Sequence, residues 1–430
     1  MKKLLIAATA VLVSSSPLIL LPMEKELTLT SKQVQKLAQN TTVSLSQFKQ
    51  IPKNPRTVTS ILTYKNKELT DFKTNIQADT KLSISAISWN AKGEPVFQLQ
   101  DGDYVAASQK SIIDDSVYDQ KPVDMTLWTK DGLTVYKEPY VSGTDKADSK
   151  LASFKPIKVS RAAQTHAGTY YFADGEGWIN ASDLSTTDNR IEAVQKVLNE
   201  KYNNQESISV YVKQLDTDRI AAINDEKSMY AASVAKLGVL YYAQERLSQK
   251  KLSLSDEYQY TSAVNGFPGA YDPDGSGKIS KMPDDKNYSL ENLLKAVAQN
   301  SDNVATNILG YYVTNQYDKA FQKSVDKAAA TSWNMDKKEL TARAAGTLME
   351  AVYRQNGDII NYLSSTDYDG ERISKNIDVP VAHKIGDAYD FKHDVAIVYA
   401  DSPFILSIFT DKEGYDKITS IADDVYGILK

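Results

Sequence analysis

The chain has 430 residues, 42% apolar and 24% charged, which is the balance of a globular protein and more chain than one ordinary core holds. Fifty Lys and Arg against 55 Asp and Glu leave a net charge of −5, which gives no electrostatic basis for binding nucleic acid. The absence of cysteine excludes disulfides, thiol nucleophiles and cysteine-held zinc, and with only three histidines we expect no metal site and no cofactor. A nucleophile in this chain would therefore be activated by a group other than imidazole.

The first segment, residues 1–23, is built like a secretory signal. Two lysines precede an apolar run from Leu4 to Val13, and three serines and a proline follow it. A second apolar patch extends the run, so residues 4–23 also reach the length of about 20 residues that spans a bilayer. No clear cleavage site is present, and a cleaved signal peptide and a retained membrane anchor both stay open. In either case we expect the remaining chain to be exported.

The following stretch is rich in Thr, Ser and Tyr and predicts an all-β region. Residues 82–89 alternate with period two, as in a half-buried strand. Asp-Gly pairs, typical of tight hairpin turns, stand at 101–102, 131–132 and 174–175. The segments around the first and last of these pairs are similar to each other, which indicates two small β modules. We place them at residues 24–116 and 117–187.

The second module resembles bacterial SH3-like cell-wall modules. The resemblance rests on the run Leu133–Pro139 and on the later Gly177-Trp178-Ile179. It implies a module that binds a cell-wall polymer. The alternative is an ordinary β-rich spacer, and the sequence leaves both open.

Residues 188–430 form the second predicted domain, which is mixed α/β. Polar residues at 187–189 are good helix caps, and apolar residues then recur at helical spacing. We expect strands at 208–212, 394–399 and 404–409, and helices at 230–247, 290–297, 303–313 and 342–354. Strands at both ends with helices between them predict an α/β sandwich in which the terminal strands share one sheet.

The segment Ser228–Gln244 carries the first chemical signal. Lys236 is its one formal charge in an otherwise apolar and tyrosine-rich run. On a helix it shares a face with Ser233, one turn earlier. An amine that loses its solvation becomes able to accept a hydroxyl proton, which makes Ser233 a nucleophile without histidine. A lysine that snorkels from a buried helix is the plain alternative for this pair alone.

Two later strings complete a pattern. Ser301-Asp302-Asn303 falls between two helical stretches, where capping is its default role, and Lys384-Ile385-Gly386 precedes the last strands. Each string is common by itself. The order Ser-x-x-Lys, Ser-Asp-Asn, Lys-x-Gly is the signature of class A β-lactamases and penicillin-binding proteins.

The chain resembles that serine hydrolase family over about residues 190–430. Residues 228–237 are similar to its nucleophile helix, 293–307 to the helices around its second motif, and 381–398 to its third motif and next strand. The resemblance implies a β-lactamase-like sandwich, with an antiparallel sheet from both ends of the domain and a helical subdomain.

The resemblance also implies a role for each motif residue. Ser233 attacks a carbonyl and becomes acylated, Lys236 accepts its proton, and Ser301 relays a proton to the leaving nitrogen. The substrate would be held by Asn303, by Lys384 and by the strand at Gly386 and Asp387. The backbone N–H groups of Ser233 and Asp387 would form the oxyanion hole.

Three departures from the family pattern bear on turnover. Class A β-lactamases have a glutamate that activates the deacylating water, and the one local candidate here is Glu339, which we expect to start a helix instead. Ile385 replaces the usual Thr or Ser, and Asp387 adds negative charge beside an anionic substrate. We therefore expect no rapid β-lactam turnover, and slow acylation or action on a peptide stays open.

The segment between the first two motifs holds other candidates. Residues 272–279 fit the start of a calcium-loop pattern, but its twelfth position is Pro283, so we interpret the string as a turn. Tyr271 and Tyr288 lie in the same segment and are candidates to reach the site.

Two functions follow from these patterns. The first is an exported serine hydrolase or acyltransferase that forms an acyl-enzyme on Ser233 with β-lactams or D-alanyl peptides of the cell wall, positioned by its β modules or by an anchor at residues 4–23. The second is a catalytically weak or inactive cell-wall-binding protein that keeps the fold. The natural substrate, the deacylation route and the oligomeric state do not follow from the sequence.

Overall fold

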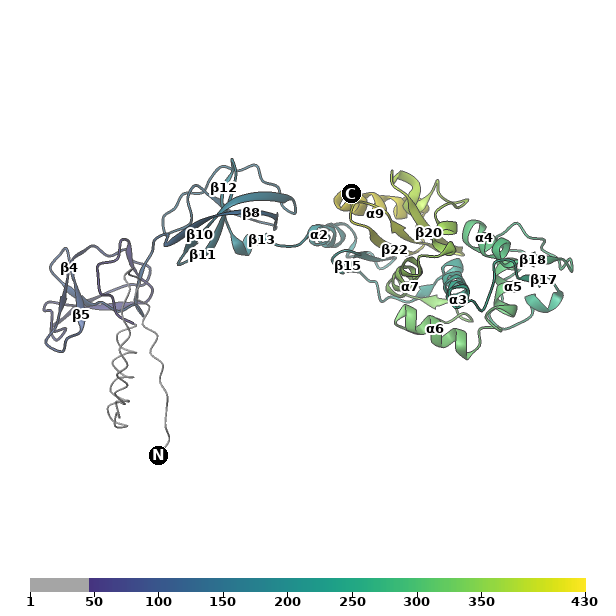
Figure 1. The fold of residues 1–430 in the computed structure, drawn as a ribbon, viewed down its shortest axis with the longest axis horizontal. Helices are drawn as coiled ribbons and strands as arrows, with labels where there is room; N and C mark the ends of the chain where they lie inside the picture. The colour runs from purple at the N-terminus through teal and green to yellow at the C-terminus, as the bar shows by residue number, and fades with distance from the viewer. Residues whose placement is uncertain (1–45) are drawn as a thin grey trace, which may run out of the picture. The chain divides into compact units, whose positions relative to one another are not determined.

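The computed structural model describes residues 46–430 (Figure 1). Their contacts divide the chain after Ser116 into two compact units. Residues 1–23, predicted to be a signal or anchor, lie outside the described part. Within residues 46–430, no helix combines the length and the apolar character that a membrane span needs.

The described part of the first unit is all-β. Its seven strands are β1 (Pro55–Thr57), β2 (Ile61–Tyr64), β3 (Phe72–Ile76), β4 (Ile84–Trp89), β5 (Pro95–Leu99), β6 (Tyr104–Ala106) and β7 (Ile112–Asp114). Five of them form an antiparallel sheet in the order β3-β2-β6-β5-β4, and β1 pairs with β7. Alternating residues such as Phe97, Val105 and Ile112 close the small core. The predicted turn at Asp101-Gly102 joins β5 to β6, and Gly102 takes the positive φ that such a turn requires.

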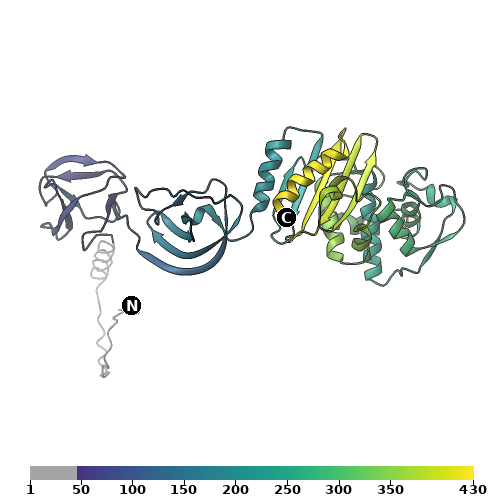
Figure 2. The same ribbon diagram turned by 90° about the horizontal axis from the view of Figure 1, so that it is seen from above.

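The second unit begins with another antiparallel sheet. Its strands are β8 (Asp119–Thr129), β9 (Val135–Tyr136), β10 (Pro156–Thr165), β11 (Gly168–Ala173), β12 (Gly177–Asn180) and β13 (Leu184–Ser185), and η1 (Ala181–Asp183) is a short 3₁₀ turn. They are ordered β13-β8-β10-β11-β12-β9. A bulge between Val159 and Arg161 bends the long pair β8 and β10, which curve around the core in Figure 2. The predicted all-β character of the N-terminal region is confirmed, with small antiparallel sheets.

The rest of the second unit contains a five-stranded antiparallel sheet in the order β15-β14-β22-β21-β20. The first two strands, β14 (Ile208–Gln214) and β15 (Ile220–Ile223), come from the start of the domain, and β20 (Val381–Ala388), β21 (Phe391–Val398) and β22 (Phe404–Asp411) come from its end. β14 pairs with β22 over seven residues, from Ile208↔Thr410 to Gln214↔Phe404. The predicted sheet shared by both ends of the domain is therefore present, and β20 forms one edge of it.

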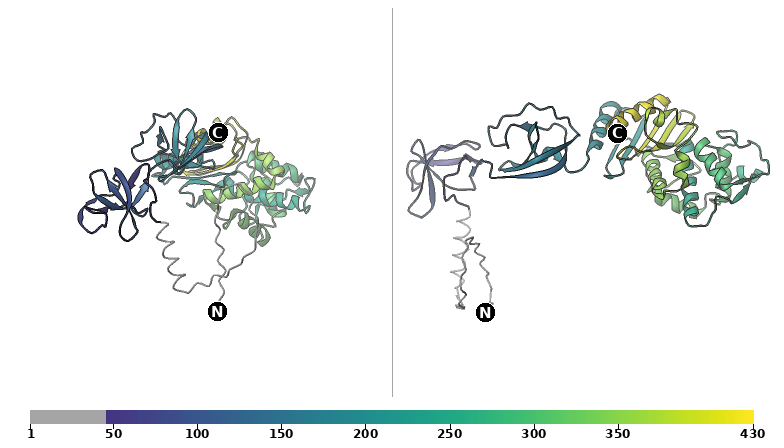
Figure 3. Two further views of the ribbon diagram at one scale, coloured as in Figure 1. Left: turned by 60° about the vertical axis from the view of Figure 1, so that its left-hand side comes forward. Right: turned by 45° about the horizontal axis from the view of Figure 1, so that its top comes forward.

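Helices cover both faces of this sheet. The α-helices described are α2 (Arg190–Tyr202), α3 (Leu237–Ser248), α4 (Leu290–Asn300), α5 (Asn303–Tyr312), α6 (Lys319–Ala329), α7 (Ala342–Gln355), α8 (Asp358–Leu363) and α9 (Tyr415–Leu429). Short elements are β16 (Met229–Tyr230), β17 (Glu257–Gln259), β18 (Asn287–Ser289) and β19 (Glu339–Leu340), with 3₁₀ turns η2 (Ala232–Lys236), η3 (Ser262–Asn265) and η4 (Arg372–Asn376). α2 and α9 pack on one face, and α7 crosses the other (Figure 1). Figure 3 shows the helical region of this domain, which consists of the green helices that follow α3.

Two buried cores correspond to the two faces of the five-stranded sheet. The core under α2 and α9 includes Val194, Leu198 and Phe404, and the larger core under α7 joins the sheet to the helical region through α3. The predicted motif residues stand beside this larger core, where η2, α4, α5 and β20 meet.

Candidate functional site

A strained turn presents Ser233. Ala232, the residue before it, has φ of +50°, a left-handed conformation that costs a non-glycine residue free energy. The turn is held from outside: the Ala231 N–H donates to the carbonyl of Lys338 (2.7 Å), and the Tyr271 hydroxyl donates to the carbonyl of Ala232 (3.3 Å). Such a bend, kept by neighbouring segments, projects one side chain at a fixed angle.

The turn also changes how the helix begins. We predicted one helix from 230 to 247, but residues 232–236 form the 3₁₀ turn η2, and α3 starts at Leu237. In a 3₁₀ turn, residues three apart eclipse each other, so Ser233 and Lys236 still share a face. As the second residue of η2, Ser233 places its N–H in the first turn, where N–H groups have no acceptor within the helix.

Lys236 is fully buried, and its hydrogen bonds go to neutral oxygens. Its Nζ donates to the carbonyl of Ser301 (2.6 Å), to Asn303 Oδ1 (2.6 Å) and to Ser301 Oγ at 3.4 Å. Burial, and then the positive charge of Lys384, lowers the pKa of Lys236 well below its ordinary value. Within residues 46–430, Ser233 Oγ is not among the hydrogen-bond partners of this amine. A direct proton transfer therefore needs these two side chains to come into hydrogen-bond contact.

The second motif reaches the site from the junction of α4 and α5. Ser301 ends α4 with φ of +53°, which turns the chain sharply and aims its buried hydroxyl at the amines. Asp302 caps α5 by accepting from the Ala305 N–H, and it also accepts from the N–H groups of Lys278 and Ile279. Asp302 therefore has the capping role that we took as the default for this motif. The cap positions the residues on either side of Asp302.

Asn303 links the second motif to the segment after Tyr271. Its Oδ1 accepts from Lys236, and its Nδ2 donates to the carbonyl of Asp272 at 2.7 Å. Gly275 lies so close that an added Cβ would stand 2.3 Å from this amide. The segment that we interpreted as a turn therefore packs against the motif, and the described residues hold no cluster of His, Cys, Asp and Glu that suits a metal ion.

The third motif approaches from β20. Lys384 Nζ donates to Ser301 Oγ at 2.8 Å, so the Ser301 hydroxyl lies within reach of two amines from separate parts of the chain. Burial lowers the pKa of Lys384 to about 7, although the charge of Asp394 opposes it. Gly386 is needed for contact with the turn at Ala231 and Ala232 that presents Ser233, called the nucleophile turn below. A Cβ at Gly386 would meet the Ala231 carbonyl at 2.6 Å.

The Asp387 carboxylate has three hydrogen-bond partners, two of them cations. Its carboxylate accepts from Arg372 (2.8 Å), from Lys392 (2.7 Å) and from the Tyr415 hydroxyl. Two cations therefore match the negative charge that we expected to oppose an anionic substrate. The charge that departs from the family pattern at Asp387 is therefore paired within the protein. Ile385, the other departure in this motif, is a buried apolar residue.

Two buried histidines flank the motif on β20 and β21. Burial disfavours a charged His383, but Asp394 and then Asp369 outweigh it and raise the pKa of His383 to about 9. Its Nδ1 lies 3.0 Å from Asp394, and its Nε2 lies 3.1 Å from Asp369. His393 differs, because burial lowers its pKa to about 4, and its ring nitrogens meet the Tyr230 carbonyl and the Thr410 N–H.

Glu339 does not occupy either position that we considered for it. It is an exposed residue of the short strand β19, opposite Tyr230, and α7 begins three residues later with Thr341 as its cap. The expectation of a glutamate in the first helical turn was wrong, because β16 extends this segment by pairing with it. Within the described residues, no carboxylate accepts a hydrogen bond from Lys236 or Lys384.

Sequence reasoning missed several residues around the motifs. Lys338 was passed over beside Glu339, although it is buried near the nucleophile turn, and Arg372 was not singled out at all. Of the two candidate tyrosines, Tyr271 lies against Lys236 with the amine 4.5 Å from its ring centre, whereas Tyr288 bonds to Asp284. Both missed residues have charged neighbours in the sequence, so no local signal separated them from surface charges.

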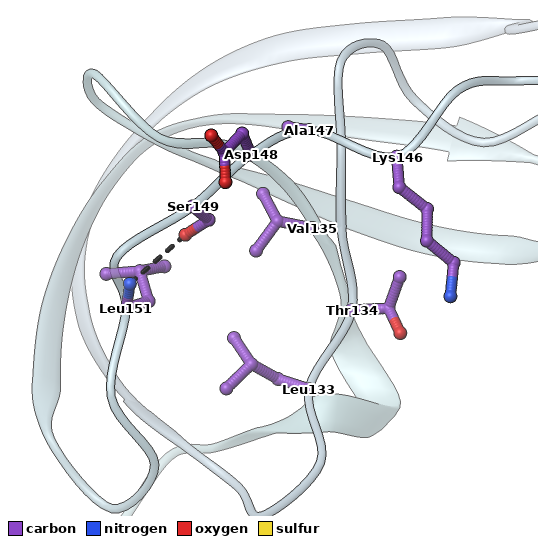
Figure 4. A pocket seen from close by; sticks show the side chains of 8 residues that line it. All are labelled: Leu133, Thr134, Val135, Lys146, Ala147, Asp148, Ser149 and Leu151. Atoms are coloured by element: carbon purple, nitrogen blue, oxygen red, sulfur yellow. Dashed lines mark hydrogen bonds between the residues drawn. The ribbon is translucent and has the colours of Figure 1, made fainter.

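A separate cavity lies in the β module at 117–187. It has a volume of about 280 Å³. Figure 4 shows the side chains of Leu133, Val135 and Leu151 around it, with Lys146 and Asp148 near its rim. The Ser149 hydroxyl accepts a hydrogen bond from the Leu151 N–H across one side. The lining of the cavity combines apolar and polar side chains, with one residue of each charge.

Comparison with known proteins gives two family matches. Residues 189–429 match the model of the beta-lactamase enzyme family, and residues 47–112 match that of a domain of unknown function, DUF5776. No curated protein matches the chain.

Several solved structures are similar to the chain. PBP-A shares 14% identity over 55% of this chain and 95% of its own, with a TM-score of 0.47. A PBP-A mutant solved as an acyl-enzyme complex with penicillin G shares 15% over 56% and 95%, with a TM-score of 0.46. A beta-lactamase from Sphaerobacter thermophilus shares 15% over 55% and 94%, with a TM-score of 0.45.

Proposed function

The chain belongs to the beta-lactamase enzyme family, and on this premise we propose that it is a serine enzyme that forms an acyl-enzyme on Ser233. The substrate class that we propose is β-lactams or D-alanyl peptides of the cell wall. One observation carries the proposal: Lys236, one turn after Ser233 in η2, and Lys384 from β20 both donate to the hydroxyl of Ser301. These contacts support a desolvated amine and a relay hydroxyl that act on Ser233.

The acylation step follows from these groups. The Ser233 Oγ–H bond breaks as Oγ bonds the carbonyl carbon, and the proton passes to the neutral amine of Lys236. The bond from the carbonyl carbon to the leaving nitrogen then breaks as Ser301 donates a proton to that nitrogen, and Ser301 regains a proton from the neighbouring amines. Backbone N–H groups of Ser233 and Asp387 stabilise the oxyanion, since Gly386 brings β20 against the nucleophile turn.

The test is the intact mass of the full chain after exposure to penicillin G or a peptide thioester. We expect a covalent adduct in the wild type and none in Ser233→Ala. Ser255→Ala, which removes an exposed serine outside the motifs, is the matched control and keeps the adduct. A wild-type mass that never changes with either reagent disproves the proposal.

We further propose that the acyl-enzyme is long-lived. The support is the set of hydrogen bonds around the two amines, in which the described residues contribute no carboxylate to activate water, while Glu339 lies exposed on β19. A time course should show one equivalent of penicillin consumed and the adduct persisting after free penicillin is removed. Repeated fast turnover would contradict this.

A second candidate is attachment to the cell wall by the β module at 117–187, in an exported protein whose residues 1–23 act as signal or anchor. The cavity of Figure 4 supports it. Sedimentation of the full chain with purified peptidoglycan tests it. Lys146→Glu should weaken binding, whereas Lys150→Glu, an exposed lysine that does not line the cavity, should not. If Ser233→Ala alters no activity and the wall is bound all the same, the weak or inactive wall-binding protein is the better description.

A further inference from the structure

Lys338 lies beneath the turn that presents the nucleophile. Its carbonyl accepts from the Ala231 N–H at 2.7 Å, and its Nζ donates to the carbonyl of Gly269 at 3.0 Å. The side chain is only 6% exposed, and the residue has φ of +54°. Burial lowers the pKa of Lys338, although the charge of Asp336 opposes this, and the side chain carries its charge at pH values below that pKa. A buried lysine in a strained conformation is retained at a cost, which calls for a role beyond packing.

The ring of Tyr271 connects Lys338 to Lys236. Each of the two Nζ atoms lies 4.5 Å from the centre of this ring, so the two amines are at most about 9 Å apart. The Tyr271 hydroxyl meanwhile donates to the carbonyl of Ala232. The ring therefore lies between the nucleophile turn and both amines.

Charged groups from four segments face Lys236. Lys384 comes from β20, Lys338 from the residues before β19, and Lys281 from the loop before β18, while Asp302 at the start of α5 is the one carboxylate among them. The oxygens of Asp302 already accept from three backbone N–H groups. Three cations thus act on Lys236 against one carboxylate, whereas its direct partners, Ser301 and Asn303, are neutral acceptors.

We propose that Lys338 is a positioning residue of this site, whose ammonium beside the Tyr271 ring keeps Lys236 in the unprotonated form that accepts the Ser233 proton. The inference rests on the proposed acyl-enzyme function. A neighbouring positive charge lowers the pKa of an amine, so loss of the Lys338 charge raises the pKa of Lys236. At a separation of about 9 Å and an effective dielectric constant of about 20, the rise is roughly one pH unit.

The experiment measures the acylation rate of the full chain with a fluorescent penicillin between about pH 5 and pH 10. In Lys338→Met the acidic limb of the profile should move up by roughly one pH unit, and the rate at a pH on that limb should fall by up to about tenfold. Lys338→Arg keeps the charge and should keep the wild-type limb. Lys337→Met removes the exposed neighbouring lysine and serves as the control.

Two results would overturn the proposal. One is an unchanged acidic limb in a folded Lys338→Met, or in Lys338→Gln if the methionine variant fails to fold. The other is an equal displacement by Lys338→Arg, since packing instead of charge would then be responsible.

A second readout separates this inference from the proposed function. The titration of Lys236 Nζ by NMR, in protein with isotope-labelled lysines, needs no acylation. If the wild type never forms an adduct, the proposed function fails, and the Lys338 inference is still decided by whether the Lys236 titration moves up in Lys338→Met. A Lys236 titration that stays in place rejects the inference even where the wild type is acylated.

Discussion

The buried cations of the C-terminal domain fall into two groups that differ in what accepts their hydrogen bonds. Lys236 and Lys384 donate to hydroxyl, carbonyl and amide oxygens. Arg372 and His383, close by in the sequence to Lys384, donate to the carboxylates of partners such as Asp387 and Asp394. Both groups are almost fully buried, so solvent exposure does not distinguish them.

The difference shows in the direction of the pKa changes. Burial with neutral acceptors lowers the pKa of both lysines, and for Lys384 the value is about 7. Carboxylate partners instead raise the pKa of His383 to about 9. Complete burial with neutral partners lets Lys236 and Lys384 give up a proton more readily, which suits chemistry, whereas a cation matched by carboxylates keeps its charge and contributes to stability.

The largest effect that we expect comes from Lys236→Met. Acylation by penicillin should slow about 10³-fold, because the proton acceptor is lost. The free energy of unfolding should change by less than about 2 kcal/mol, since the cost of burying the amine disappears together with its hydrogen bonds. Adduct formation by mass and urea unfolding of the same sample check both parts. A loss of stability larger than that of Arg372→Met would break the comparison.

Arg372→Met should have the opposite pattern, with a large loss of stability and a small effect on acylation. Its guanidinium binds Asp387 and lies 3.8 Å from the Tyr415 ring centre, so its loss leaves a partly buried carboxylate with fewer partners. We expect unfolding to become easier by about 3 kcal/mol, with less than a tenfold effect on acylation of the folded protein. Lys375→Met removes a surface ion pair from the same 3₁₀ turn and should cost less than about 1 kcal/mol. Equal losses in the two variants would contradict the contrast.

His383→Gln tests how the stability contributed by a cation with carboxylate partners depends on pH. The folded pKa of about 9 lies above the ordinary 6.5, so the stabilisation is fully present below pH 6.5 and is lost as pH rises through about 9. Wild-type unfolding free energy should fall by up to about 3 kcal/mol across that window, and His383→Gln should lack this fall. Urea unfolding at both ends of the window measures it. The exposed His166, changed to Gln, is the control and should retain the wild-type dependence.

The smallest effect that we expect is from Asp387→Asn. Its side chain is 30% exposed and still has polar partners after the change, so the loss of stability should be about 1 kcal/mol. Acylation by anionic penicillins should change less than about threefold, because Arg372 and Lys392 already match the charge. Acylation that becomes more than about tenfold faster would show that this carboxylate acts on the substrate after all.

The fold was largely accessible from the sequence. Apolar periodicity predicted the sheet and the main helices, and the three motifs predicted the family, which the match over residues 189–429 confirms. The start of the nucleophile helix was not accessible, because the left-handed Ala232 is imposed by hydrogen bonds from Lys338 and Tyr271, about 40 to 100 residues away. The SH3-like identity of the second module, the domain limits and the catalytic roles stay predictions.

The sequence by itself determined which groups are available: a serine and a lysine one turn apart, a second hydroxyl at 301, a lysine at 384, and a glycine at 386 that lets β20 approach. Spacing along a chain carries this information, because a helical turn or a strand pair has a fixed geometry. Only the tertiary structure decided which buried cations have carboxylate partners and which have none among the described residues. That depends on contacts between segments far apart in the chain, and it is those contacts that set the charge state of each amine.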